Sequence, residues 1–151
     1  MKIKRIPFTM EGLEKIKSEY QSIKNSGPDA DETLRKAREL GDLSENGLYK
    51  AARARLSSID SNLSRLEMLI KLADVQEKSS EKAGIGNKVK VKAGEEIIEY
   101  QIVGDFEADP TIKKISSHSP IGKALFDKRV GEKVIVDLPT KQLTYEIVEI
   151  S

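Results

Sequence analysis

Two runs of heptad repeat mirror each other across residues 41–46, and this symmetry allows few folds. In both runs, apolar or small residues alternate at steps of three and four, which is the seam pattern of a coiled coil. The seam positions are Leu13, Ile16, Tyr20, Ile23, Gly27, Ala30, Leu34 and Ala37 before the segment, and Tyr49, Ala52, Leu56, Ile59, Leu63, Leu66, Ile70 and Ala73 after it. In an antiparallel hairpin the numbers of facing residues have a constant sum, and these opposite positions all add up to 86. The pattern therefore predicts a helical hairpin that folds back at Leu43.

The predicted arms of the hairpin are long. Thr9 is a plausible N-cap for the first helix, and Gly27-Pro28 breaks the local helix propensity without losing the heptad phase. We therefore expect a kink or a short restart with Pro28 in its first turn, and a return helix from about residue 44 to about residue 75. At about 1.5 Å of rise per residue, the arm carries the tip roughly 45 Å from the base. Such a reach suits delivery of the tip to a recessed place.

Beyond Gly84 the periodicity changes from helix to strand. Lys88–Lys92 alternates polar and apolar residues like a half-buried strand, and similar patterns recur at 97–103, 112–115, 133–138 and 143–150, with a short helix expected at 120–126. These segments predict a small α+β domain with a mostly antiparallel sheet. We therefore expect a hairpin domain over residues 1–76, a linker over 77–83 and a compact domain over 84–151.

Composition limits what the chain binds and where it works. The 26 Lys and Arg against 25 Asp and Glu leave a net charge of only +1, so bulk positive charge does not make it a general nucleic-acid binder. Cysteine is absent, which excludes disulfides and thiol chemistry. No apolar run approaches the roughly 20 residues that cross a bilayer, and the basic start leads into no apolar signal region. We expect a cytoplasmic protein that does not bind membranes.

The tip segment supports two interpretations. Asp42 and Glu45 are three residues apart, so on a helix their carboxylates emerge on one side and can share a Mg²⁺ ion. Two acids leave that site incomplete, and a partner would have to supply the other ligands. Alternatively, the segment caps the return helix, with Asp42 or Ser44 accepting a backbone N–H. Basic residues surround the tip and favour a place where metal and phosphate lie together; they are Arg35, Lys36, Arg38, Lys50, Arg53 and Arg55.

Two motif sets lie at the tip and in the second half of the chain. The first is residues 37–46 with Tyr49 and Ala51-Ala52-Arg53. The second runs through Tyr100-Gln101-Ile102-Val103-Gly104, Glu107-Ala108-Asp109, Ile115-Ser116 and Ser119-Pro120-Ile121-Gly122-Lys123-Ala124-Leu125. Together they resemble the GreA/GreB family of bacterial transcript cleavage factors, its GreA members most of all. The resemblance implies an antiparallel coiled coil followed by a small FKBP-like domain.

The resemblance also implies a function. Family members insert the coiled coil into the secondary channel of RNA polymerase and stimulate cleavage of the 3′ end of backtracked RNA. By resemblance, Asp42 and Glu45 help hold a catalytic Mg²⁺ in the polymerase active site, with no metal expected in the isolated protein. Contacts to RNA or polymerase fall on Arg38, Ser44, Arg53, Ser119, Pro120 and Ile121. We expect a monomeric accessory factor rather than an enzyme.

Some residues depart from the family pattern. Leu40 stands where GreA commonly has His, Ser44 where it has Lys, and Gly47-Leu48 where it has Ala-Glu. The acidic pair is retained, but a channel-binding inhibitor without cleavage activity stays an alternative. A peptidyl-prolyl isomerase would need an apolar, aromatic-lined pocket, for which few aromatic residues are present. His118 has no Cys or His partners in sequence and is interpreted as a surface residue.

Overall fold

The computed structural model describes residues 2–40 and 46–151. By its internal contacts the chain divides into two compact units. One unit is Leu13–Leu72, and the other combines Met1–Gly12 with Ala73–Ser151. The predicted α+β class is confirmed, whereas the predicted limits of independent domains stay a prediction.

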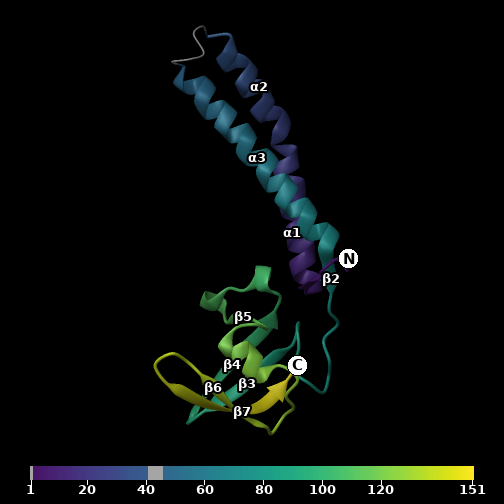
Figure 1. Cartoon of the computed structure of the whole chain (residues 1–151), viewed down its shortest axis with the longest axis vertical. Helices are drawn as coiled ribbons and strands as arrows, with labels where there is room; N and C mark the ends of the chain where they lie inside the picture. The colour runs from purple at the N-terminus through teal and green to yellow at the C-terminus, as the bar shows by residue number, and fades with distance from the viewer. Residues whose placement is uncertain (1, 41–45) are drawn as a thin grey trace. The chain divides into compact units, whose positions relative to one another are not determined.

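Three helices form the hairpin (Figure 1): α1 (Met10–Asn25), α2 (Gly27–Arg38) and α3 (Gly47–Leu72). The predicted restart at Pro28 is confirmed, because α2 begins one residue before it and Pro28 lies in its first turn. Ser26 between α1 and α2 keeps right-handed helical dihedral angles, so the direction of the first arm is retained. In the described part of the chain, no helix is long and apolar enough to span a membrane.

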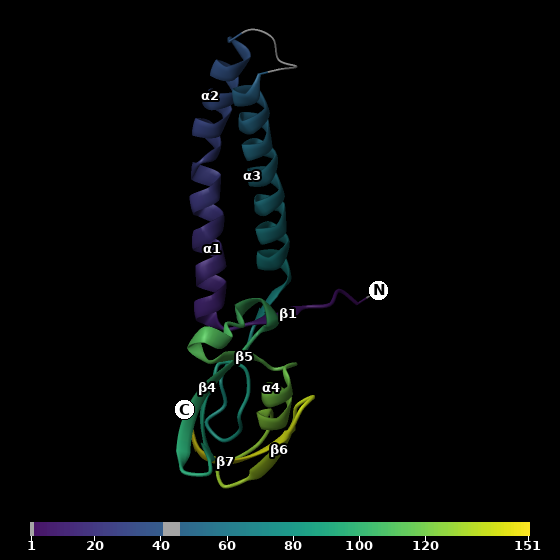
Figure 2. The same cartoon turned by 90° about the vertical axis from the view of Figure 1, so that its left-hand side faces the viewer.

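Helices α2 and α3 run side by side and antiparallel, as the mirrored heptads predict (Figures 1 and 2). Arg55 pairs with Asp29 at 3.1 Å, Arg65 pairs with Glu19 at 3.9 Å, and the Arg38 guanidinium lies 5.9 Å from the centre of the Tyr49 ring. The numbers of these partners add up to 84, 84 and 87, close to the predicted 86. The buried seam residues include Ala30, Ala37, Ala52 and Leu66.

The predicted end of the return helix is wrong. Helix α3 stops at Leu72, and Ala73–Val75 forms strand β2, which pairs in parallel with β1 (Ile6–Phe8). Phe8 is fully buried and its ring stacks on Phe106 with the centroids 6.3 Å apart. Strand β1 offers residues 73–75 backbone hydrogen bonds that replace those of the helix. The predicted start, residue 44, lies outside the described residues.

Thr9 caps α1 as predicted and also binds a distant carboxylate. Its hydroxyl accepts the N–H of Gly12 at 3.0 Å. The Glu107 carboxylate accepts the N–H of Thr9 at 2.9 Å and the Thr9 hydroxyl. Gly12 and Gly104 allow this close approach: a Cβ on Gly12 would lie 1.9 Å from the Glu107 carboxylate, and one on Gly104 would lie 2.0 Å from the Pro7 carbonyl oxygen.

The second half forms a five-stranded sheet in the order β5-β4-β3-β7-β6. Its elements are β3 (Lys88–Ala93), β4 (Glu96–Val103), β5 (Lys114–Ser116), α4 (Pro120–Leu125), β6 (Lys133–Asp137) and β7 (Gln142–Ile150). Only the β4–β5 pair is parallel, so the predicted mostly antiparallel sheet is confirmed. Ile112 belongs to a 3₁₀ turn, Pro110–Ile112, rather than to the predicted strand, because Asp109 caps that turn.

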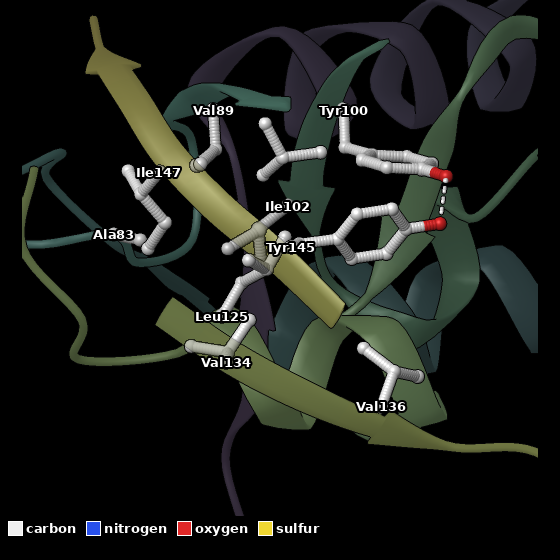
Figure 3. Packing of buried hydrophobic residues seen from close by; sticks show 10 residues of the cluster. Ala83, Val89, Tyr100, Ile102, Leu125, Val134, Val136, Tyr145 and Ile147 are labelled. Carbon is white, nitrogen blue, oxygen red and sulfur yellow. Dashed lines mark hydrogen bonds between the residues drawn. The ribbon is translucent and has the colours of Figure 1, made fainter. Parts of the chain in front are cut away.

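Apolar side chains of the sheet and α4 form the core of this domain (Figure 3). Ile102, Leu125 and Ile147 are almost fully buried. The hydroxyls of Tyr100 and Tyr145 lie 3.3 Å apart, and burial together with this contact raises the pKa of the Tyr100 phenol. Ala83, placed in the linker by sequence, is fully buried in this core.

We expect Gly104→Ala to destabilise the protein, because the new Cβ would meet a backbone oxygen of Pro7 that cannot rotate away. Overpacking of this kind lowers the free energy of unfolding by about 1–3 kcal/mol, which urea denaturation measures. Gly84→Ala is the control, since its Cβ would meet its nearest neighbour at an ordinary 3.7 Å. Equal stability of the two variants would contradict the close approach of Gly104 to the Pro7 carbonyl.

Candidate functional site

Asn46, which directly follows the predicted acidic tip, is an N-cap that the sequence analysis did not predict. Asp42, Ser44 and Glu45 lie outside the described residues, so their grouping stays a prediction. Asn46 accepts the N–H of Tyr49 at 3.1 Å and donates to the Ala37 carbonyl at 2.8 Å. It therefore caps α3 and ties that helix to the end of α2. Asparagine directly before Gly47 was the available signal, because it ranks among the strongest N-cap residues.

The basic residues around the tip differ in how strongly their charge is compensated. Arg35 pairs with Glu39 at 2.7 Å, Lys36 with Glu32 at 3.3 Å, and Arg55 with Asp29 at 3.1 Å. Among the residues that the structure describes, no acidic partner pairs with Lys50 or Arg53. Around the tip, Lys50 and Arg53 are therefore more available to an external anion than the paired Arg35, Lys36 and Arg55.

Arg38 and Arg53, both predicted to contact RNA, lie on the same flank of the hairpin. Tyr49 and Arg53 are four residues apart on α3 and so share one face of that helix. The Arg38 guanidinium lies 5.9 Å from the Tyr49 ring centre, which places Arg38 of α2 beside the same face. We call Arg38, Tyr49 and Arg53 the cationic flank. Tyr49 is half-buried, so it serves both the seam and this flank.

The three predicted contact residues of the second half lie at the start of α4. Ser119 is the N-cap: its hydroxyl accepts the N–H of Gly122 at 3.1 Å and donates to the Ser116 carbonyl at 2.6 Å. Ile121 packs against the core, whereas Pro120 is exposed. Of the three, only Pro120 is exposed to solvent.

His118 precedes this corner and binds a carboxylate. Its Nδ1 lies 2.9 and 3.1 Å from the two carboxylate oxygens of Asp105, which also accepts the Ser116 hydroxyl. The Ser116 hydrogen bond, followed by the one from His118, lowers the pKa of Asp105 from its ordinary value. Within residues 2–40 and 46–151, no group of three or more His, Cys, Asp or Glu side chains could hold a metal. The interpretation of His118 as a surface residue agrees with its exposure.

The chain thus combines a long helical hairpin that has a cationic flank with a small α+β domain. Two family models together match nearly the whole chain. "Transcription elongation factor, N-terminal" matches residues 6–75, and "Transcription elongation factor, GreA/GreB, C-term" matches residues 78–151. The chain therefore belongs to the GreA/GreB family of transcription elongation factors.

Individual relatives agree with this assignment. The chain is 42% identical to the transcription elongation factor GreA of Thermodesulfovibrio yellowstonii, with 97% of each chain covered. It is 38% identical to that of Nitratiruptor sp., over 95% of this chain and 91% of the relative. Among solved structures, GreA factor homolog 1 of Thermus thermophilus matches with a TM-score of 0.46 at 26% identity, covering 97% of this chain and 99% of the other.

We expect NMR titration to show a lowered pKa for the Asp105 carboxyl, and Ser116→Ala to raise this pKa more than His118→Ala does, because Ser116 is the larger cause. A lowered folded pKa stabilises the folded state above the unfolded pKa, and this contribution is lost as pH falls through the folded pKa. Ser117→Ala is the neighbouring control. An Asp105 midpoint unmoved by Ser116→Ala would disprove the assigned cause.

Proposed function

We propose that this protein enters the secondary channel of RNA polymerase with its hairpin and stimulates cleavage of the 3′ end of backtracked RNA, so that arrested complexes resume. One observation supports the proposal: α2, which ends at Arg38, and α3, which begins at Gly47, run antiparallel, with Asp29 paired with Arg55. The 26 residues of α3 extend about 39 Å. Family membership supports the same reading, in which the chain is an accessory factor and the polymerase is the enzyme.

The chemistry of the tip depends on Asp42 and Glu45. Carboxylate oxygens are the ligands that Mg²⁺ prefers, but two of them form only part of a coordination shell. Asp42 and Glu45 would therefore hold the ion jointly with polymerase residues. When bound, Mg²⁺ supplies activation of water and stabilisation of the leaving oxygen. The contribution of this chain is to bring two correctly spaced carboxylates to the end of a stiff arm.

The cationic flank would contact the extruded RNA. Arg53 has no acidic partner among the described residues, and Arg38 is held against the Tyr49 ring, so both can meet a phosphate without losing a strong ion pair. Ser44 would contribute a hydroxyl at the tip. The corner made by Ser119, Pro120 and Ile121 would meet the polymerase, chiefly through the exposed Pro120.

We expect Asp42→Ala and Glu45→Ala each to reduce RNA cleavage in stalled, backtracked complexes to the rate of polymerase alone, because each removes a ligand from the shared ion. Binding to polymerase should stay nearly unchanged. Asp60→Ala removes an exposed acid from the shaft of α3 and is the matched control. Full cleavage by both tip variants would refute the assigned roles. Binding by the unchanged protein without any cleavage would instead favour the channel-binding inhibitor.

We expect Arg53→Ala to weaken engagement of the backtracked complex several-fold at low salt and much less at high salt. Losing one phosphate contact to a single strand reduces the salt slope of log K by about 0.7. Titrations at several ionic strengths measure both effects. Arg65→Ala is the control, because Arg65 lies on the same helix as Arg53 but pairs with Glu19 of α1. A change in affinity on Arg53→Ala that did not depend on salt would contradict a contact of Arg53 with RNA.

A further inference from the structure

The hairpin carries an apolar groove near its tip, between α2 and α3. Its volume is about 350 Å³. The buried Ala37 and Ala52 line its floor, and the aliphatic Leu40 and Leu48 form its walls. Lys36 and Arg55 also line it, one from each helix. We call these six residues the leucine groove.

The packing of the hairpin does not explain the two leucines. Leu40 is 66% exposed and Leu48 is 65% exposed. Both lie outside the heptad seam, whose nearest members are Ala37 and Tyr49. Two large aliphatic side chains that line one hollow, yet contribute little to the helix pair, are available to a partner.

The leucine groove and the cationic flank lie on opposite sides of the hairpin. Arg38 is two residues from Lys36 on α2, and two residues correspond to about 200° around a helix; Leu40 follows the end of α2 and lines the groove together with Lys36. Arg53 stands in the same relation to Arg55 on α3. The arginines that the proposed function assigns to RNA therefore point away from the groove on both helices.

The chemistry of the groove favours protein over nucleic acid. Bases are held by stacking on aromatic side chains, and the nearest ring, Tyr49, belongs to the cationic flank. The groove offers aliphatic walls with a cation from each helix. Lys36 and Arg55 pair with Glu32 and Asp29 in exposed ion pairs, which contribute little and exchange easily. A second copy of the chain would bring these cations against each other.

We infer that the leucine groove docks a protein segment of the polymerase channel, one with an aliphatic side chain beside a carboxylate. The aliphatic group fills the space between Leu40 and Leu48, and the carboxylate replaces Glu32 or Asp29 as a partner of Lys36 or Arg55. This inference rests on the proposed function, because it names the polymerase as the partner. It adds a positioning surface, distinct from the residues that meet RNA or metal.

The first test is the double variant Leu40→Ser with Leu48→Ser, assayed for cleavage in backtracked complexes. The half-saturating concentration should rise about tenfold, equivalent to about 1.4 kcal/mol. The maximal cleavage rate should be retained at saturation, because the tip acids are intact. Unlike the effect of Arg53→Ala, this loss should not fade at high salt. Met68→Ser, which changes a 52% exposed residue farther along α3, is the control. An unchanged half-saturating concentration would overturn the inference.

The second test is photo-crosslinking, which needs no cleavage. Leu48→p-benzoylphenylalanine in the full chain should give adducts with a polymerase subunit in complexes of purified polymerase and labelled RNA. The same replacement at Arg53, on the opposite flank, should give RNA adducts. Adducts of position 48 with RNA or with a second copy would overturn the inference. The absence of adducts at position 48, while position 53 gives RNA adducts, would overturn it too. Failure of the unchanged protein to bind polymerase would instead count against the proposed function.

Discussion

The register of the antiparallel helix pair decides which residues stand at the turn. Ala30, Ala37 and Ala52 are the buried residues in the tip half of the seam, whereas the larger Leu34, Tyr49 and Leu56 are only partly buried. Polar contacts must then help to hold the register. Asn46 does so directly, because its amide joins the Ala37 carbonyl to the first turn of α3. A slip of one heptad would move the centre of the turn by about half that length.

Sequence reasoning succeeded where the controlling signal is local. The heptads predicted the helix pairing and its register, and the alternation of polar and apolar residues predicted the strands of the second half. It failed at the base of the hairpin, where the decisive partners are distant in sequence. Residues 73–75 continue the heptad phase, yet they pair as a strand with β1, because Phe8 of β1 is buried beside Phe106. The Glu107 carboxylate on Thr9 spans 98 positions, and no periodicity indicates such a contact.

At the candidate site the same division holds. Spacing brought out the acids and arginines, and helix geometry places Arg38 and Arg53 on one flank. Ion-pair partners could not be read from composition, since the 25 acids and 26 bases can be matched in many ways. In the structure, Arg35, Lys36 and Arg55 form ion pairs with carboxylates, whereas Arg53 has no acidic partner among the described residues. Net charge alone therefore does not indicate which basic residues near the tip are compensated.

A rod that enters a channel along its own axis keeps one freedom, rotation about that axis. Contacts on a single flank restrain this rotation poorly, because the rod can roll while they slide. The attraction between a side-chain cation and a phosphate falls off slowly with distance, so it tolerates small displacements. An aliphatic side chain seated between Leu40 and Leu48 is directional, because close packing is lost with small displacements. In the proposed complex, contacts of unlike chemistry on opposite flanks restrain this rotation and so strengthen binding, whereas the donated carboxylates determine the maximal cleavage rate.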